Sequence, residues 1–330
     1  MFKLPERIQL ANLPTKIEKL ERLTKEAGGP QIFIKRDDQT GTEVSGNKIR
    51  KLEYVIKEAL DQNCDYLITC GGIQSNHARA TAAAAAKLGL GAYLVLAGSE
   101  NEAIDGNYFL DKLLGADIEF ISREDYSESR MEIMEGIKYK LIKQGHKPYI
   151  IPEGASDGIG TFGYYTAMEE ILEQEKQLGV HFDAIVLAVG SGGTYSGMFL
   201  ANKILNNNSV IYGINVGGDA AYFQDRIMGI LKDSFRYIDY EASFSKDEIR
   251  IIDGYVGVGY ALSRPEELEF IHKLARLEGV VLDPVYTGKA MYGLVNEIKK
   301  GSMSQYKNIL FVHTGGIFGV FPKSDLFFNL

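Results

Sequence analysis

Cysteine is scarce in this chain, which has only Cys64 and Cys70 among its 330 residues. Two cysteines exclude a disulfide scaffold, and a reducing cytoplasm is the simplest setting for such a protein. The two thiols do not form a C-x-x-C pair and the five histidines are scattered along the chain, so the sequence offers no metal site.

Long apolar runs and an excess of positive charge are also missing. The longest apolar candidate, residues 81–98, contains Lys87 and three glycines, and the N-terminal residues lack the apolar segment of a signal peptide. The net charge of −8 argues against a nucleic-acid-binding surface and favours work on small molecules. We therefore expect a cytoplasmic protein with no membrane or nucleic-acid partner.

The chain does contain a regular alternation of strand-like and helix-like segments. Apolar strand-like runs separated by helices are typical of βαβ units with parallel sheets, in which ligands bind at the carboxyl ends of the strands. The predicted helices include 76–87, 106–114 and 124–144. The predicted strands are 31–36, 66–70, 92–96, 117–121, 149–151, 184–189, 210–214 and 309–312.

Glycine and hydroxyl residues follow four of these strands, after Cys70, Ile151, Val189 and Val312. The most suggestive is Gly190-Ser191-Gly192-Gly193-Thr194, a loop between a strand and a helix whose N–H groups and hydroxyls could hold a phosphate. A tight turn would also need glycines. Tyr195 stands where a dinucleotide fingerprint needs glycine, and no P-loop occurs, so a dinucleotide or ATP is disfavoured.

The segment Ser45–Glu53 carries the most unusual lysine. Ile49, Leu52, Ile56, Ala59 and Leu60 recur at helical spacing, and Asn47 is suited to cap the N-terminus of that helix. Lys48 would then lie where the helix dipole repels a cation, which lowers its pKa and makes its amine a better nucleophile. Taken on its own, Lys48 is better explained as a solvated surface lysine, as most of the 36 Lys and Arg residues must be.

Two further loops are polar beyond what a helix start requires. Residues 71–77, Gly-Gly-Ile-Gln-Ser-Asn-His, could hold a carboxylate, although Ser75 and Asn76 are also ordinary capping residues. Residues 283–289 include Tyr286, which could be a core aromatic with its hydroxyl satisfied, the usual fate among the 19 tyrosines. An amine nucleophile, a phosphate loop and a carboxylate site together favour pyridoxal 5'-phosphate as cofactor and a small amino acid as substrate.

Three runs, residues 45–54, 71–76 and 283–286, resemble the 1-aminocyclopropane-1-carboxylate deaminase and D-cysteine desulfhydrase family. Its members are fold-type II pyridoxal-phosphate enzymes related to the tryptophan synthase β-subunit. The resemblance covers nearly the whole chain. It implies two α/β domains with parallel or mixed sheets and the cofactor between them, and a homodimer. The large domain would comprise residues 1–50 plus 161–330, and residues 51–160 would form a smaller inserted domain.

The resemblance also implies roles for individual residues. Lys48 would be the Schiff-base lysine and general base, and Asn76 would bond the cofactor's phenolic oxygen. Ser75, Asn76 and His77 would bind the substrate carboxylate, and Tyr260 and Tyr286 would be active-site tyrosines. The phosphate would be held by Lys51, Gly190, Ser191, Gly192, Gly193 and Thr194. Thr287 and Thr314 would also contact the cofactor.

Three positions separate the two activities within the resemblance. Deaminases carry Glu, Leu and Gln where this chain has Thr287, Thr314 and His77, and at all three it resembles D-cysteine desulfhydrase. A carboxylate beside the pyridine nitrogen keeps that nitrogen protonated and strengthens the electron sink that ring opening needs, whereas a threonine hydroxyl does not. Hydroxyls at 287 and 314 therefore favour β-elimination.

The resulting hypothesis is elimination from D-cysteine to pyruvate, ammonia and hydrogen sulfide. The alternatives are deamination of 1-aminocyclopropane-1-carboxylate and elimination from another small amino acid such as cysteate or β-chloroalanine. A non-catalytic anion- or nucleotide-binding protein with the same fold is a further alternative, which the combination of Lys48, Ser75 and Tyr286 disfavours.

Overall fold

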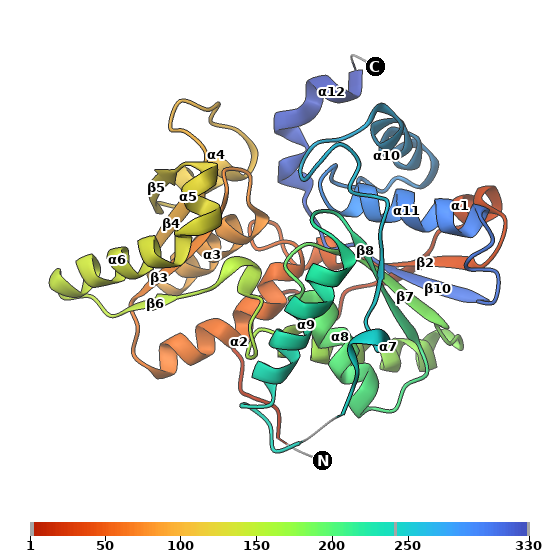
Figure 1. The fold of residues 1–330 in the computed structure, drawn as a ribbon, viewed down its shortest axis with the longest axis horizontal. Helices are drawn as coiled ribbons and strands as arrows, with labels where there is room; N and C mark the ends of the chain where they lie inside the picture. The colour runs from red at the N-terminus through yellow and green to blue at the C-terminus, as the bar shows by residue number, and fades with distance from the viewer. Residues whose placement is uncertain (1–2, 241–242, 329–330) are drawn as a thin grey trace.

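The computed structural model describes residues 3–240 and 243–328, which form two lobes that are each built around a sheet (Figure 1). The larger sheet has six strands in the order β1-β2-β10-β7-β8-β9, of which only the β1–β2 pair is antiparallel. Its strands are β1 (Ile17–Lys19), β2 (Gln31–Lys35), β7 (Ala184–Val189), β8 (Val210–Asn215), β9 (Arg250–Ile252) and β10 (Asn308–Val312).

The smaller sheet is parallel throughout and has the order β5-β4-β3-β6. Its strands are β3 (Tyr66–Gly72), β4 (Gly91–Ala97), β5 (Asp117–Ile121) and β6 (Pro148–Ile150). The helices of this lobe are α3 (Asn76–Leu88), α4 (Gly106–Leu113), α5 (Arg123–Glu128) and α6 (Arg130–Lys143).

The other helices belong to the larger lobe or join the two, and helices connect most parallel strands, as βαβ units require (Figure 1). They are α1 (Glu21–Ala27), α2 (Asn47–Asp61), α7 (Phe162–Leu178), α8 (Gly193–Ile204), α9 (Ala220–Ser234), α10 (Pro265–Glu278), α11 (Thr287–Lys299) and α12 (Ser324–Phe328). Of the described residues, no helix combines the length and the apolar composition needed to cross a membrane.

All six residues of strand β7 are buried, which explains why its sequence is continuously apolar. Ile185, Leu187 and Val189 face a core shared with α2, α7 and α8. The alternate residues Ala184, Val186 and Ala188 face a second core with α1, α10 and α11. A strand with helices on both faces needs apolar residues at both phases of its period-two alternation. The predicted α/β class with parallel and mixed sheets is therefore confirmed.

Helix α2 joins the lobes. Its predicted apolar stripe is buried from Ile49 to Ala59, with Leu60 partly buried, and the helix packs on both α3 and α7. The core on this side is continuous between the lobes. Because α2 runs through residue 51 without a break, the chain shows no linker there, and the boundaries at residues 50 and 160 stay a prediction.

Two local predictions were wrong. The single helix expected at 124–144 is two helices that meet at Ser129, whose φ of −130° is not helical. Asn47 does not cap α2, because the capping position is Gly46, with a φ of 98° that favours glycine. A Cβ on Gly46 would lie 2.8 Å from the carbonyl oxygen of Thr314, so this close approach also requires glycine.

Candidate active site

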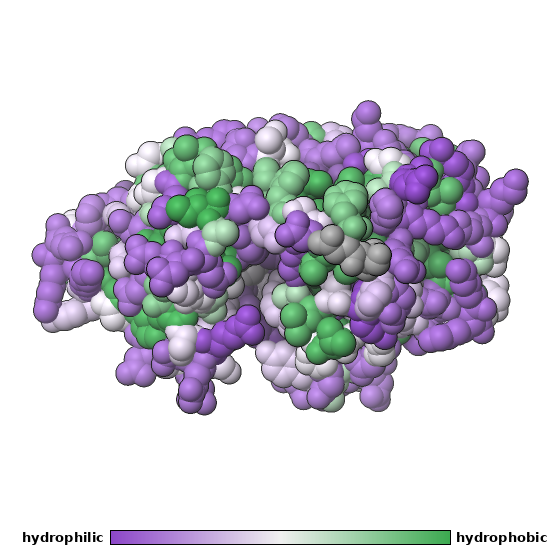
Figure 2. Space-filling model, turned by 90° about the horizontal axis from the view of Figure 1, so that it is seen from above, coloured by the Kyte–Doolittle hydropathy of each residue, from purple (hydrophilic) through white to green (hydrophobic). Residues whose placement is uncertain are grey.

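A cavity of about 990 Å³ lies between the two lobes. Seen from above, the surface is hollowed where the lobes meet (Figure 2). The carboxyl ends of β3, β4, β7 and β10 open into it, together with the N-termini of α2, α3 and α8. Strand ends and helix starts both direct backbone N–H groups and polar loop residues at a ligand, so this position is where the fold predicts binding.

Lys48 lies in the first turn of α2 and lines this cavity. Its Nζ donates to Oδ1 of Asn47 at 3.1 Å and lies 6.0 Å from the ring centre of Tyr286. Burial lowers the pKa of Lys48 to about 8, against the opposing charges of Glu153 and Asp283. The predicted direction of this pKa shift is confirmed, but its largest cause is burial and not the helix dipole that the sequence suggested. The amine is therefore partly neutral, and reactive, near neutral pH.

The predicted phosphate loop leads from β7 into α8. Gly192 has a φ of 90°, and a Cβ on Gly193 would lie 2.7 Å from Oγ of Ser156. That hydroxyl lies 2.7 Å from Oγ of Ser191 and accepts from the backbone N–H of Gly193 at 3.3 Å. The glycines thus bring the N-terminus of α8 against Ser156, a residue that the sequence analysis did not select.

Lys51 reaches the same point from α2. Its side chain is fully buried, and its one hydrogen bond among the described residues goes to Oγ of Ser156 at 3.2 Å. Burial and the nearby charge of Lys48 hold the pKa of Lys51 well below its usual range. A buried ammonium with only a hydroxyl partner, facing a helix N-terminus, is a site built for an anion. The chemistry of these donors fits the phosphate of pyridoxal phosphate.

The loop before α3 lines the opposite wall. Oγ of Ser75 accepts from the N–H of Ala78 at 3.1 Å, so Ser75 caps the helix, as its residue type allowed. Oδ1 of Asn76 accepts from Nδ2 of Asn107 at 3.0 Å. The N–H groups of this first turn point toward the cavity end of the helix, where a carboxylate could bind.

His77 is buried behind this loop. Its Nε2 lies 2.8 Å from Oγ1 of Thr69, while its Nδ1 has no hydrogen-bond partner in the described part of the chain. Burial, with the positive charges of Lys48 and Lys51, holds the pKa of His77 well below its usual range. The ring is therefore neutral at neutral pH, and its predicted role in carboxylate binding stays a prediction.

Tyr286 and Tyr260 meet over the cavity. Their hydroxyls are hydrogen-bonded to each other, and their ring centres are 6.0 Å apart. Burial raises the pKa of Tyr286, so its hydroxyl keeps its proton. A Cβ on Gly190 would lie 2.9 Å from the Tyr286 ring, which explains this glycine of the phosphate loop.

The turn at Asp283 precedes α11 and uses Thr287 internally. Oδ1 of Asp283 accepts from the N–H and the hydroxyl of Thr287, at 2.8 and 2.7 Å. Oδ2 accepts from the N–H groups of Val285 and Tyr286, both at 2.9 Å. Asp283 and Thr314 are among the described residues that line the cavity, whereas Thr287 is not. The hydroxyl of Thr287 thus supports Asp283 instead of facing the cavity.

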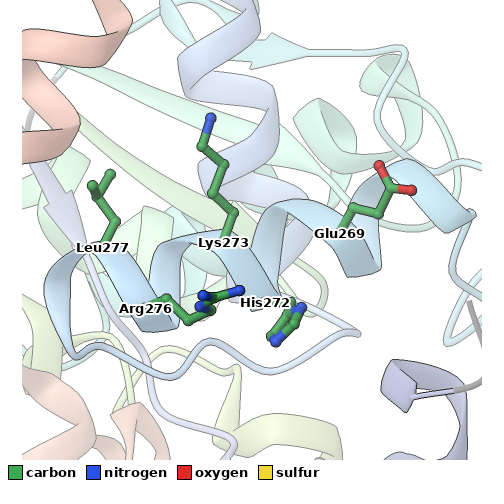
Figure 3. A pocket seen from close by; sticks show the side chains of 5 residues that line it. All are labelled: Glu269, His272, Lys273, Arg276 and Leu277. Atoms are coloured by element: carbon green, nitrogen blue, oxygen red, sulfur yellow. The ribbon is translucent and has the colours of Figure 1, made fainter.

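A second hollow of about 410 Å³ lies on the surface of α10. Its five residues come from one helix, and Lys273 points away from Arg276 and His272 (Figure 3). Nζ of Lys273 is already paired with Glu26 at 2.6 Å. Because no polar groups converge there, the cavity between the lobes is the candidate site.

The chain is similar in sequence to known proteins. The family described as pyridoxal-phosphate dependent enzyme matches residues 8–315. A protein of Arabidopsis thaliana named bifunctional D-cysteine desulfhydrase/1-aminocyclopropane-1-carboxylate deaminase, mitochondrial, is 43% identical over 96% of this chain and 79% of its own. A D-cysteine desulfhydrase of Klebsiella pneumoniae is 37% identical over 94% of each chain.

A crystal structure of a homologue of 1-aminocyclopropane-1-carboxylate deaminase is also similar. It superposes with a TM-score of 0.91 at 40% identity and covers 99% of this chain and 96% of that one. The predicted fold-type II architecture and the predicted pyridoxal phosphate cofactor are both confirmed. A cavity built around a lysine amine and an anion cradle is what that cofactor requires, and the chain belongs to the family of pyridoxal-phosphate-dependent enzymes.

Proposed function

We propose that this enzyme catalyses α,β-elimination from D-cysteine, which with one water yields pyruvate, ammonia and hydrogen sulfide. Two relatives carry the name D-cysteine desulfhydrase, and this supports the reaction without fixing the substrate of this chain. When bound, pyridoxal phosphate supplies an electron sink for the pair left at the substrate α-carbon. The cytoplasmic location and the homodimer belong to the same proposal.

Lys48 has two tasks in this scheme. Its amine would hold the cofactor, and as a free amine it would accept the substrate α-proton as general base. Burial keeps a share of this amine neutral, and Oδ1 of Asn47 orients it. Nδ2 of Asn47 donates to Oγ1 of Thr194 at 2.9 Å, so the position of the base is tied to the phosphate loop.

The remaining side chains bind the substrate and hold protons. Ser75, Asn76 and His77 form the loop at the start of α3, where the positive end of the helix attracts the substrate carboxylate. The Tyr286 hydroxyl, protonated and supported by Tyr260, orients the departing sulfur or gives it a proton. Lys51, Ser156 and the loop Gly190–Thr194 bind the phosphate.

One observation carries the choice of elimination over ring opening. The resemblance places position 287 beside the cofactor's ring nitrogen, and in this chain the nearest carboxylate of that turn is Asp283. A carboxylate has about four lone-pair sites, and all four on Asp283 are taken by donors of its own turn. The turn therefore offers no free carboxylate to keep a ring nitrogen protonated. The weaker electron sink that results suits the expulsion of a good leaving group at the β-carbon.

Deamination of 1-aminocyclopropane-1-carboxylate is the second candidate. The names of the Arabidopsis relative and of the similar crystal structure both include that activity. Its ring must open without a leaving group, so it depends most on a protonated ring nitrogen. Cysteate and β-chloroalanine would be consumed by the same elimination chemistry and differ only in the group expelled.

The test is the purified holoenzyme with each amino acid in turn. Pyruvate and sulfide are assayed with D-cysteine and L-cysteine, pyruvate with cysteate and β-chloroalanine, and 2-oxobutanoate with the cyclopropane amino acid. We expect the highest kcat/KM for D-cysteine. Thr287→Glu should move the ratio toward the cyclopropane substrate, with Thr287→Gln, similar in size but uncharged, as its control. A holoenzyme that yields 2-oxobutanoate and no sulfide would overturn the proposal.

A further inference from the structure

Behind the cavity wall, a buried guanidinium controls the direction of two side-chain amides. We propose that Arg79 and Asn107 orient the amide of Asn76 as a hydrogen-bond donor toward the cavity, so that the site selects a cofactor with an acceptor oxygen at that point. Both are positioning residues that act through Asn76. The inference rests on the proposed function and adds to it the origin of this polarity.

Arg79 starts the relay. It lies on α3 and is fully buried, and its Nε donates to Oδ1 of Asn107 at 3.1 Å. A guanidinium has only donors. The atom of Asn107 that faces Arg79 must therefore be the oxygen, and this settles the orientation of the Asn107 amide without any other contact.

Asn107 in turn orients the side-chain amide of Asn76. It lies in the first turn of α4 and is also fully buried. With its oxygen turned to Arg79, its Nδ2 donates to the carbonyl of Gln74 and to Oδ1 of Asn76, both at 3.0 Å. The oxygen of Asn76 is thereby engaged on the protein side. Asn76 lines the cavity, so its NH₂ group is the end left to face a ligand.

The same guanidinium fixes the distance between Asn76 and Lys48. Nη1 and Nη2 of Arg79 donate to the carbonyls of Glu43 and Ser45, at 2.5 and 3.0 Å. These carbonyls belong to the loop that leads directly into α2 and Lys48. One side chain therefore ties the start of α3 in the smaller lobe to the lysine loop in the larger one.

Stability alone does not explain Arg79. All its hydrogen bonds among the described residues go to neutral oxygens, and burial lowers its pKa to about 10, with the charge of Asp111 opposing. The carboxylate of Asp111, one turn along α4, has no hydrogen-bond partner among the described residues. A buried cation without a bonded anion is costly, and an apolar residue of similar volume would be the cheaper choice for packing.

Asn107→Asp tests the relay by reversing its polarity. The new carboxylate still accepts from Arg79, which favours folding, but it also presents an oxygen to Asn76. The Asn76 amide must then turn, so that its own oxygen faces the ligand. Dissociation constants of the apoenzyme are measured for pyridoxal phosphate and for 3-deoxypyridoxal 5'-phosphate, which lacks the phenolic oxygen. We expect the wild type to prefer the natural cofactor by about tenfold or more, and the variant to lose this preference.

Two further variants complete the experiment. Asn308→Asp, another buried asparagine, lies at the opposite end of the large sheet and should keep the preference. Arg79→Lys keeps the charge but not the planar fork, and should reduce the preference even if Asn107→Asp fails to fold. An Arg79→Lys protein with the full wild-type preference would overturn the inference, as would a wild type that binds both compounds equally. A wild type that binds neither would overturn the proposed function itself.

Discussion

Buried charged side chains are paired with carboxylates on one side of helix α2 and, in the described part of the chain, have no carboxylate bonded to them on the other. On one side, Arg50 pairs with Asp37 at 2.8 Å and Glu170 at 3.0 Å, and Lys35 pairs with Glu170 as well. On the other side, within residues 3–240 and 243–328, Lys48 has only an amide oxygen and Lys51 only a hydroxyl as hydrogen-bond partner. Residues 48 and 50 are two positions apart, so they point to nearly opposite sides of the helix.

Charged side chains that stabilise the fold thus differ from charged side chains that are placed to bind a ligand. In the paired cluster, Arg50 holds the pKa of Asp37 below its usual range despite complete burial, so both members stay ionised. On the other side, burial lowers the pKa values of Lys48 and Lys51 by more than the nearby carboxylates raise them. Buried groups with perturbed pKa values in a cavity are typical of functional sites, and the fully paired cluster is typical of scaffolding.

Lys48→Ala should have the largest effect on activity, because it removes the lysine on the cavity side of α2. Removal of the amine takes away the attachment point and the general base together. We expect kcat for pyruvate formation from D-cysteine to fall by roughly 10³-fold or more, with an unchanged melting temperature of the apoenzyme. Lys87→Ala, an exposed lysine on α3, serves as the control. A Lys48→Ala enzyme of near wild-type kcat would remove Lys48 from the site.

Arg50→Met should destabilise the paired cluster on the other side of α2. Asp37 and Glu170 would lose their main partner, and a buried carboxylate without compensation is strongly destabilising. We expect the free energy of unfolding to fall by about 3–5 kcal/mol, measured by urea denaturation. Arg22→Met removes an exposed partner of Glu278 and should cost less than about 1 kcal/mol. Equal losses in the two variants would contradict the distinction between the regions.

Lys51→Met sharpens the contrast, because it should weaken binding without weakening the fold. The phosphate would lose a charge-assisted hydrogen bond, so we expect the affinity of the apoenzyme for pyridoxal phosphate to fall roughly 10- to 100-fold. Its unfolding midpoint should stay level or rise, since an uncompensated cation has been removed. Lys57→Met changes the same helix at a lysine paired with Asp61 and should leave the affinity unchanged. A lowered midpoint at wild-type affinity would assign Lys51 to the scaffold.

The pH dependence of cofactor capture should show the smallest effect. Only the neutral amine of Lys48 attacks, and its pKa is lowered to about 8. The rate of appearance of the yellow holoenzyme from apoenzyme should therefore rise about tenfold from pH 7 to pH 9 and then level off. Stopped-flow absorbance measures it. A rate that continues to rise up to pH 10 would mean that the amine titrates like an ordinary lysine.

Local patterns in the sequence predicted much of the fold and part of the site. The strand at 184–189, the glycine loop after it and the apolar stripe of α2 were all readable, because each depends on neighbours within a few residues. The cap of α2 was not. Asn47 is a good capping residue, but the approach of Gly46 to Thr314 decides the position.

The rest of the site depends on contacts between distant segments. Ser156 meets Lys51 across 105 positions, and only the glycines and hydroxyls after Ile151 hinted at its loop. The bonds from Arg79 to the carbonyls of Glu43 and Ser45 leave no mark on residue type, because every residue has a carbonyl. The resemblance predicted that Thr287 acts beside the cofactor. Its hydrogen bond to Asp283 could be found only in the folded structure.

Reduction of the holoenzyme with borohydride, followed by peptide mass spectrometry, would show directly whether Lys48 carries the cofactor. Borohydride fixes the cofactor to the lysine that carries it, and the modified peptide identifies that lysine among all those in the chain. We expect a single modified residue, Lys48, whose amine is partly neutral and faces the cavity. Modification of Lys51 or Lys323 instead would contradict the assignment of the two sides of α2.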